Sequence, residues 1–350
     1  MKSWNGSQSV LCADFFLPIL ERLFQKRKDM KAIRMTGVGD VHVLKYSDEP
    51  DPRPGENEVL IDVRAAGVNF MDIGIRRGMK GGAYKPTILG VEGAGRVIEI
   101  GPGVVDFRPG DRVSWVYVAS SYAERVVANV NSLVKIPDHI DDLTAAAVMM
   151  QGLTASHFAT EFYPVRQDDL ALVHAGAGGL GLILTQLIKL RGGNVISRVS
   201  SSDKIGAAVA AGADHVIVDT EGSFAEEAIR LSGGVGVDVV FDGSGPKTFQ
   251  GSLAALRPSG TLCWFGPVLG GPGPIDIMSL PKSVKIGYAV FSDHIPTPTL
   301  LRRHTNQLFE WIGEGRLNVT IGGQYPLSEA ARAHADMENR ATIGKLLLIP

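Results

Sequence analysis

The sequence predicts an α/β protein in which a partly closed β-barrel is joined to a doubly wound parallel sheet. Short apolar stretches punctuated by Gly and Pro fill residues 31–135, which is typical of barrel strands. From Leu170 onward, apolar stretches alternate with helical patterns, as in a parallel sheet covered by helices on both faces. The 350 residues are enough for about two domains.

The first part of the chain predicts strands and turns. The first strand is expected at residues 31–35, and residues 59–64 nearly alternate apolar and polar side chains, as a half-buried strand does. Residues 90–100 are rich in β-forming side chains but include Gly93 and Gly95, which favour a bulge or a close approach of another backbone. Residues 109–113 predict a turn that enters the next strand.

The second part predicts the parallel sheet and its helices. Strands are expected at residues 170–174, 194–199, 216–218, 237–241 and 261–265, and helices at 180–190, 204–211, 224–231 and 247–256. A further helix over 300–314 leads to a last strand over 345–349. Because that strand needs a partner, we expect the tail to return to the first domain.

These patterns divide the chain into three regions. Residues 30–152 together with 290–350 are predicted to form the barrel domain, and residues 153–289 the parallel-sheet domain. Residues 1–29 are expected to lie outside the fold, since the region is too charged and broken for a secretory core and too acidic for a mitochondrial presequence. The alternative is an amphipathic helix that packs on the body of the protein.

Composition excludes several classes of protein. The net charge of −2 gives no global basic field for nucleic acid or a membrane surface, and no apolar run reaches the length of a membrane span. The two cysteines, Cys12 and Cys263, are far apart and indicate no disulfide framework. A cytoplasmic protein is the simplest interpretation.

One motif points to a nucleotide. Gly176-Ala177-Gly178-Gly179-Leu180-Gly181 fits G-x-G-x-x-G between a predicted strand and a predicted helix, the context that supports dinucleotide binding. The three glycines allow the tight turn, the approach of backbone to the pyrophosphate, and close packing of helix on strand, and the helix N-terminus attracts phosphate. The sequence therefore predicts a Rossmann domain. The alternative is a glycine-rich turn with no ligand.

The next strand end predicts NADP(H) rather than NAD. An NAD site usually places Asp or Glu there for the ribose hydroxyls, but this chain has Ser197 and Arg198, followed by Ser200, Ser201 and Lys204. Hydroxyl groups and cations suit a 2′-phosphate. The alternative is that Arg198 and Lys204 are ordinary solvated charges.

A catalytic metal is not expected. No His-x₃-His pair with helix spacing occurs and no cysteine lies near the predicted cleft, so the sequence lacks the ligands of a catalytic zinc. His157 is the one histidine of interest, predicted on a helix after a Gly152-Leu153-Thr154 turn. A packed or surface histidine is the favoured interpretation.

Four segments together resemble a known family: Asn69-Phe70-Met71-Asp72, residues 90–95 (GVEGAG), Gly152-Leu153-Thr154, and residues 174–181 with the glycine motif. They are similar, in order, to the quinone oxidoreductase (zeta-crystallin-like) branch of the zinc-free medium-chain dehydrogenases/reductases. The resemblance runs from Lys31 to the C-terminus. It implies a GroES-like barrel, a Rossmann domain and a homodimer. Zinc-dependent relatives have Cys at Asn69 and a His-Glu pair at Val91-Glu92, so both ligands are missing here.

The resemblance also implies roles for particular residues. Asn69, Gln151 and Thr154 correspond to positions near the nicotinamide, with the last two on a turn between the domains. Gly74 stands where many family members have a tyrosine, and Tyr84 is the candidate substitute. The alternatives are a water molecule in that role and a Tyr84 that only packs in its loop, which is the favoured interpretation. The implied cofactor-binding residues are the motif 176–181 together with Ser200, Ser201, Lys204, Phe265, Gly266 and Lys345, with Phe291 a weaker candidate.

The predicted reaction is hydride transfer from NADPH to a quinone or a related conjugated carbonyl, without zinc. Quinone oxygens need little acid assistance, which suits a site without an evident general acid. Two alternatives stay open: a reductase of conjugated enones or enoyl thioesters, and an NADPH-binding structural or regulatory protein with little turnover.

Overall fold

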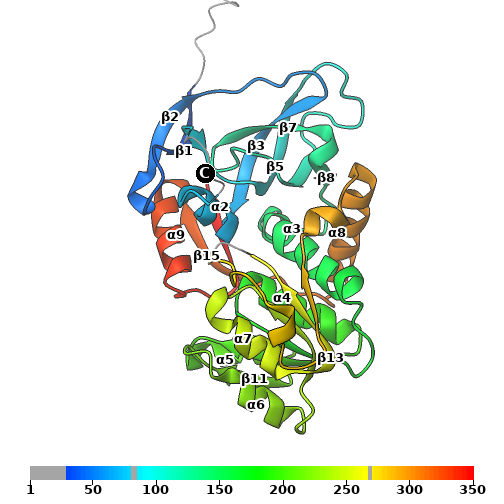
Figure 1. Ribbon diagram of the computed structural model, residues 1–350. Coiled ribbons are helices and arrows are strands. Elements are labelled where there is room, and N and C mark those ends of the chain that lie inside the picture. Colours follow the sequence, from blue (N-terminus) through cyan, green and yellow to red (C-terminus); the bar gives the residue numbers. More distant parts are fainter. Residues whose placement is uncertain (1–28, 80–84, 267–269) are drawn as a thin grey trace, which may run out of the picture.

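The computed structural model describes residues 29–79, 85–266 and 270–350. They form two lobes, one built on mostly antiparallel sheets and one on a parallel sheet, with the C-terminal strand in the first lobe (Figure 1). The predicted α/β class, with a barrel and a doubly wound sheet, is confirmed. The exact domain limits stay a prediction. No helix in these three ranges is long and apolar enough to cross a membrane.

The parallel sheet has the order expected of a doubly wound fold. Among the described residues it contains six strands in the order β11-β10-β9-β12-β13-β14, and every neighbouring pair is parallel. The strand bounds are β9 Leu170–Val173, β10 Asn194–Val199, β11 His215–Val218, β12 Val237–Asp242, β13 Leu256–Trp264 and β14 Lys285–Tyr288. The sequence did not predict β14. The order reverses between β9 and β12, where ligands bind in such sheets.

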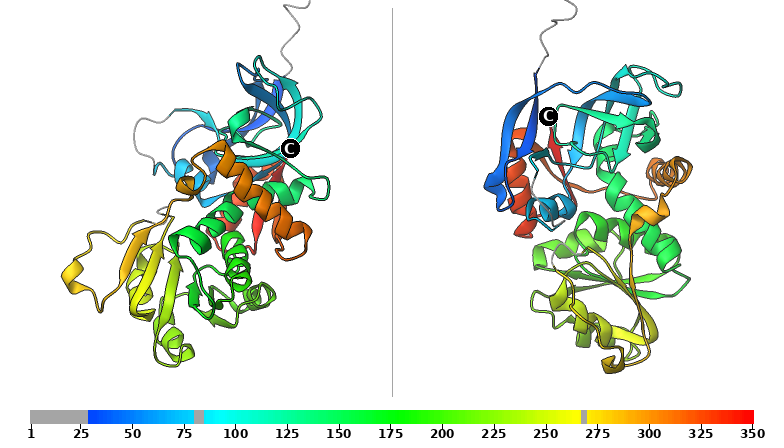
Figure 2. Two further views of the ribbon diagram at one scale, coloured as in Figure 1. Left: turned by 90° about the vertical axis from the view of Figure 1, so that its right-hand side faces the viewer. Right: turned by 45° about the horizontal axis from the view of Figure 1, so that its top comes forward.

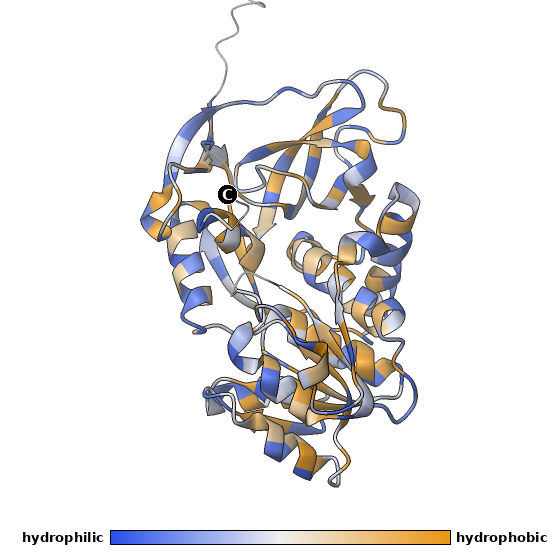
Figure 3. Ribbon diagram, viewed as in Figure 1, coloured by the Kyte–Doolittle hydropathy of each residue, from blue (hydrophilic) through white to orange (hydrophobic). Residues whose placement is uncertain are grey.

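Alternating residues of these strands enter two separate cores. Val173 packs in the core that also contains residues of α4, whereas its neighbour Leu172 packs in the core that contains Phe224 and Phe249. Hydrophobic residues follow the strands, whereas the outer helices carry both hydrophobic and hydrophilic residues (Figure 3). The helices are α4 Gly179–Leu190, α5 Ile205–Ala210, α6 Phe224–Leu231 and α7 Pro246–Ala255. The predicted helix at 204–211 is preceded by a 3-10 turn that includes Lys204.

The other lobe closes on the C-terminal strand. Its larger sheet has the order β15-β16-β3-β5-β6-β8 with β7 also paired to β3, and its smaller sheet the order β2-β1-β4. The bounds are β1 Asp29–Met35, β2 Leu44–Pro50, β3 Glu58–Gly67, β4 Thr87–Ile88, β5 Glu92–Ile100, β6 Arg112–Val116, β7 Arg125–Asn129, β8 Leu133–Lys135, β15 Ile321–Pro326 and β16 Lys345–Ile349. Leu347 pairs with Gly67, which confirms the predicted return of the tail.

Two expectations about this lobe have different outcomes. A Cβ at Gly93 would lie 2.6 Å from the Ala65 carbonyl oxygen, and one at Gly95 would overlap that of Asp62. The predicted close approach of backbone is therefore confirmed. The expected limit at residue 29 stays a prediction, although Asp29 already pairs with Pro50 in β1. Residues 1–28, which are also expected to lie outside the fold, are not among the described residues.

A helix replaces the predicted turn at Gly152. The long helix α3 runs over Asp142–His157 and a five-residue π-helical turn follows it, so the prediction that Gln151 and Thr154 lie on a turn is wrong. The glycine serves packing: a Cβ there would lie 2.9 Å from Leu308 Cδ1, on the neighbouring helix α8 (Pro298–Gly313). Figure 2 shows α8 along α3. The remaining helices are α2 Phe70–Arg76 and α9 Ala330–Glu338.

Candidate functional site

One pocket joins the two lobes. It lies at the carboxyl ends of β9, β10 and β12, where the sheet order reverses, and the barrel side closes it. Residues 68–70 and Gln151 line it from the barrel side, and 173–175, 177–181, Leu184, 198–200, Lys204, Gly243, Ser244 and Phe265 from the parallel sheet. Met337, Arg340, Thr342, Gly344 and Lys345 line it from the return segment.

The glycine motif forms a cradle at the start of α4. Gly178 is the N-cap of this helix, whose first N–H groups have no partner within the helix and face outward. A Cβ on Gly176 would collide with Ser197 Oγ, and one on Gly181 would lie 2.5 Å from the Ala175 carbonyl oxygen. The motif therefore needs glycine for steric reasons at both ends. This geometry fits a pyrophosphate.

Lys204 and Arg340 meet at the far end of the pocket. The Lys204 ammonium is buried and donates to Ser200 Oγ at 3.0 Å and to the Arg340 carbonyl oxygen. Burial lowers the pKa of Lys204. Arg340 itself is exposed, and its side chain lines the same pocket. Two cations and one hydroxyl group therefore surround the place where an adenosine phosphate would lie.

Arg198 does not share this role. Its guanidinium donates to Asp219 Oδ2 at 2.8 Å and lies over the Phe224 ring, 5.0 Å from the centroid. Both charged partners are buried. Arg198 and Lys204 are both buried, so the alternative interpretation of them as solvated charges is wrong. Arg198 is not available for a phosphate, because Asp219 already neutralises its charge.

At the opposite end of the pocket, four polar side chains form a closed network. Asn69 donates from Nδ2 to Glu92 Oε1 at 2.7 Å, and its Oδ1 accepts from Gln151 Nε2 at 2.8 Å and Lys345 Nζ at 2.9 Å. Lys345 also forms an ion pair with Glu92, whose other oxygen accepts from the Met150 N–H at 2.7 Å. Gln151 Oε1 is buried and has no hydrogen-bond partner among the described residues. It is the free acceptor that a carboxamide such as nicotinamide requires.

A buried acid supports the start of α2 beside this network. Asp72 Oδ2 accepts from the Asn69 N–H at 2.9 Å and from Tyr122 Oη at 3.0 Å. Burial raises the pKa of Asp72 to about 7, although both hydrogen bonds oppose the shift. The folded protein therefore holds a proton that the unfolded chain loses at lower pH.

This pKa predicts a pH dependence of stability. Between the ordinary carboxyl pKa and about 7, the folded state binds more protons than the unfolded state, so the contribution of Asp72 is present at low pH and lost as the pH rises. Asp72→Asn keeps an acceptor for both donors and removes the titration. Urea unfolding at pH 5 and pH 8 should show a smaller loss of stability with pH in the variant than in the wild type. Equal losses would contradict the assignment.

Most predicted site residues line this pocket, but some do not. It includes Asn69, residues 177–181, Ser200, Lys204, Phe265 and Lys345. Thr154 donates to the Met150 carbonyl oxygen at 2.6 Å within α3, and Ser201 donates to Asp203, which lowers the pKa of that carboxyl. Gly176 and Gly266 flank the lining residues, and Phe291 stacks on Tyr117 with centroids 5.0 Å apart. Tyr84 lies outside the described residues.

Family models match both parts of the chain. The model described as "Alcohol dehydrogenase GroES-like domain" matches residues 55–138, and the model described as "Zinc-binding dehydrogenase" matches residues 211–348. The quinone oxidoreductase of Pseudomonas aeruginosa is 35% identical over 323 residues, which cover 91% of this chain and 99% of that protein. This chain belongs to the quinone oxidoreductase family. The predicted family and its oxidoreductase character are therefore confirmed.

Two further relatives are similar to this chain, one a quinone oxidoreductase and the other a 2-haloacrylate reductase. The solved structure of the Escherichia coli quinone oxidoreductase complexed with NADPH has a TM-score of 0.88 and 33% identity, and covers 91% of this chain and all of that one. The 2-haloacrylate reductase of a Burkholderia species is 33% identical over 306 residues, 85% of this chain and 92% of its own length.

The polar network keeps a buried carboxylate next to a buried ammonium group. Lys345 donates to Asn69 Oδ1 and forms an ion pair with Glu92. A cation that belongs to the chain thus balances the buried carboxylate. No local pattern predicts this contact, because Lys345 follows Glu92 by 253 residues.

Arg340 and Gly344 are the site residues that sequence reasoning missed. Gly344 donates its N–H to the Ala177 carbonyl oxygen at 2.8 Å and forms a parallel bridge with Gly178. Both residues lie between α9 and β16, far along the chain from the glycine motif. The only local signal is a glycine directly before the last strand.

Proposed function

We propose that this protein is an NADPH-dependent reductase that transfers hydride to a quinone or a related conjugated carbonyl, without zinc. One observation carries the proposal: a single pocket connects the glycine cradle and Lys204 to the network of Asn69, Gln151 and Lys345. Family membership supports it, since relatives are quinone oxidoreductases and one is solved with NADPH.

The chain's own residues bind and orient the cofactor. The free N–H groups at the start of α4 would hold the pyrophosphate, and Lys204, Ser200 and Arg340 would hold the 2′-phosphate. Gln151 Oε1 would accept a hydrogen bond from the carboxamide. NADPH bound in this way supplies the hydride. Phe265, packed on Phe158 with centroids 4.7 Å apart, gives the pocket an apolar wall that would exclude water.

Protonation is left to solvent. No described lining residue has a carboxyl group, and burial lowers the pKa of His174, the lining histidine, to about 4. Reduced quinone oxygens are stable enough as anions to take protons from water, whereas an isolated ketone would need a positioned acid. Asn69 and the Glu92–Lys345 ion pair form the polar end of the pocket. We propose a supporting role for Thr154 through the α3 backbone, and Tyr84 as the alternative proton source to solvent.

A second candidate reaction is reduction of an activated double bond. The 33% identity to a 2-haloacrylate reductase favours this alternative. Both reactions use the same cofactor pocket, so the acceptor decides between them. A binding protein with little turnover is the third outcome to be tested.

We extend the proposal to the oligomeric state and the cellular location of the protein. Strand β14 is an edge strand, and Ile277 and Met278 just before it are strongly exposed. An exposed edge with apolar neighbours can pair with a second copy, so we propose a homodimer. The lone described cysteine, Cys263, is free and buried, in keeping with a cytoplasmic enzyme.

NADPH oxidation followed by absorbance tests the proposal. An ortho-quinone and a conjugated enone are offered in parallel, with NADH in place of NADPH and with chelator-treated protein as controls. We expect faster quinone reduction, a preference for NADPH and no loss of rate after chelation. Activity on the enone alone would support the second reaction. Tight NADPH binding with no turnover on either acceptor would reject both.

A further inference from the structure

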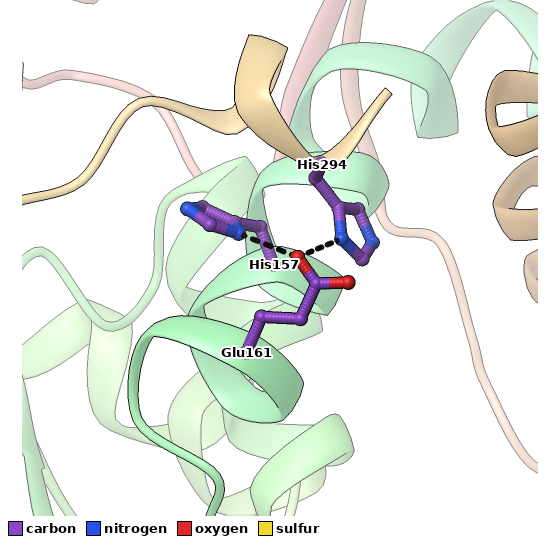
Figure 4. Close-up of side chains that lie close together, drawn as sticks. All are labelled: His157, Glu161 and His294. Carbon is purple, nitrogen blue, oxygen red and sulfur yellow. Dashed lines mark ion pairs between the residues drawn. The ribbon is translucent and has the colours of Figure 1, made fainter. Parts of the chain in front are cut away.

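Three side chains converge where α3 ends, outside the pocket that binds the cofactor. His157 is the last residue of α3, Glu161 lies in the π-helical turn that follows, and His294 ends the short 3-10 helix Phe291–His294. Figure 4 shows both imidazole rings directed at one oxygen of the Glu161 carboxylate. π-Helical turns are rare and occur frequently at functional sites.

The distances suit a small metal ion. Glu161 Oε2 lies 2.9 Å from His294 Nδ1 and 3.5 Å from His157 Nδ1, and all three atoms lie within 4.8 Å of one another. Ligand atoms in a tetrahedral zinc site, with bonds of about 2.0–2.1 Å, are about 3.3 Å apart. The cluster needs only small side-chain rotations to reach that geometry.

The hydrogen bonds leave the facing nitrogen atoms available. Within the described part of the chain, the two Nδ1 atoms face only Glu161, as ion-pair partners, and neither has another hydrogen-bond partner. His294 Nε2 lies 3.1 Å from Ser156 Oγ. A ring that donates from Nε2 presents the Nδ1 lone pair, and metal-bound histidines are usually oriented in this way by a second partner.

Burial divides the cluster into a closed and an open side. The side chains of His294 and His157 are buried, and the parallel ring of His304 covers His294 with centroids 3.6 Å apart. Glu161 is 48% exposed, so a water molecule can reach a fourth position.

We propose that His157, Glu161 and His294 bind one divalent transition-metal ion, with zinc the best match. Two imidazoles and one carboxylate are ligands that zinc accepts, with water as the fourth. The expectation that the chain binds no metal rested on the positions of a catalytic zinc and on the two cysteines, and neither observation concerns this cluster.

The site has a structural role rather than a catalytic one. Bound metal links the 3-10 helix at Phe291–His294 to the end of α3. Phe291 stacks on Tyr117, and Phe158, next to His157, contacts the pocket residue Phe265. The metal therefore stabilises these segments against unfolding, and hydride transfer does not require it. This inference holds whichever substrate the enzyme reduces.

Metal titration of the full-length protein tests the inference. After removal of metal with a chelator, zinc is titrated by calorimetry, and cobalt(II) by its visible absorbance, which reports coordination geometry. We expect one zinc ion per chain, micromolar affinity or better, a four-coordinate cobalt spectrum and a zinc-dependent rise in Tm. His294→Gln should weaken zinc binding by about 100-fold or more, because a direct ligand contributes at least as much as its hydrogen-bond partners.

Two further variants keep the test decisive if His294→Gln folds poorly. Glu161→Gln changes a half-exposed side chain and should also weaken zinc binding, whereas His215→Gln, at an exposed histidine elsewhere, should not. Binding no tighter than millimolar in the wild type would overturn the inference. So would wild-type affinity in folded Glu161→Gln.

Discussion

Replacing Lys345 with Met is expected to lower the free energy of unfolding by about 3–5 kcal/mol, the cost of breaking a buried ion pair. Lys345 is 2% exposed and Glu92 0%. The ammonium donates to Glu92, to Asn69 Oδ1 and to the Val68 carbonyl oxygen at 3.0 Å. Met fills a similar volume but leaves the Glu92 charge buried without its cation.

The matched comparisons are Lys285→Met, which removes an exposed lysine, and the double variant Glu92→Gln/Lys345→Met. Urea unfolding should show little change for Lys285→Met. The double variant should recover much of the lost stability, because it buries no uncompensated charge. If Lys345→Met were no less stable than Lys285→Met, the ion pair would contribute nothing measurable to the stability of the fold.

The parallel sheet was predictable because its signals are local. The strands β9 to β13 and the helices between them carry their own apolar patterns, and the glycine motif lies within one strand-turn-helix unit. Helix α3 was missed for a physical reason. Gly152 resembles a turn residue in sequence, whereas in the fold it provides room for Leu308 on α8, a contact between segments far apart in the chain.

In the candidate site, too, the features encoded by neighbouring residues were predictable and the contacts between distant residues were not. The cradle for phosphate was found from six consecutive residues, but the partners of its charged groups were not. Asp219, 21 residues after Arg198, changes Arg198 from a candidate phosphate ligand into half of an ion pair. Arg340 reaches the pocket from 136 residues beyond Lys204. Such pairings depend on tertiary structure, which periodicity and spacing do not encode.

Lys204→Ala is expected to weaken NADPH binding by about 1.5–3 kcal/mol, the range for a hydrogen bond to a charged group, or about 10- to 150-fold in Kd. NADH lacks the 2′-phosphate, so its Kd should change little, and the preference for NADPH should fall by the same factor. Fluorescence titration of both cofactors measures this difference directly.

The ratio of the two affinities separates recognition from structural damage. Lys204 also donates to Ser200 and to the Arg340 carbonyl oxygen, so its loss can loosen the pocket, but loosening weakens NADPH and NADH together. Lys247→Ala, at an exposed lysine outside the pocket, should leave both affinities unchanged. By contrast, Arg198→Ala removes the partner of buried Asp219 and should reduce stability without a selective effect on NADPH. An unchanged NADPH/NADH ratio in Lys204→Ala would mean that Arg340 and Ser200 recognise the 2′-phosphate without Lys204.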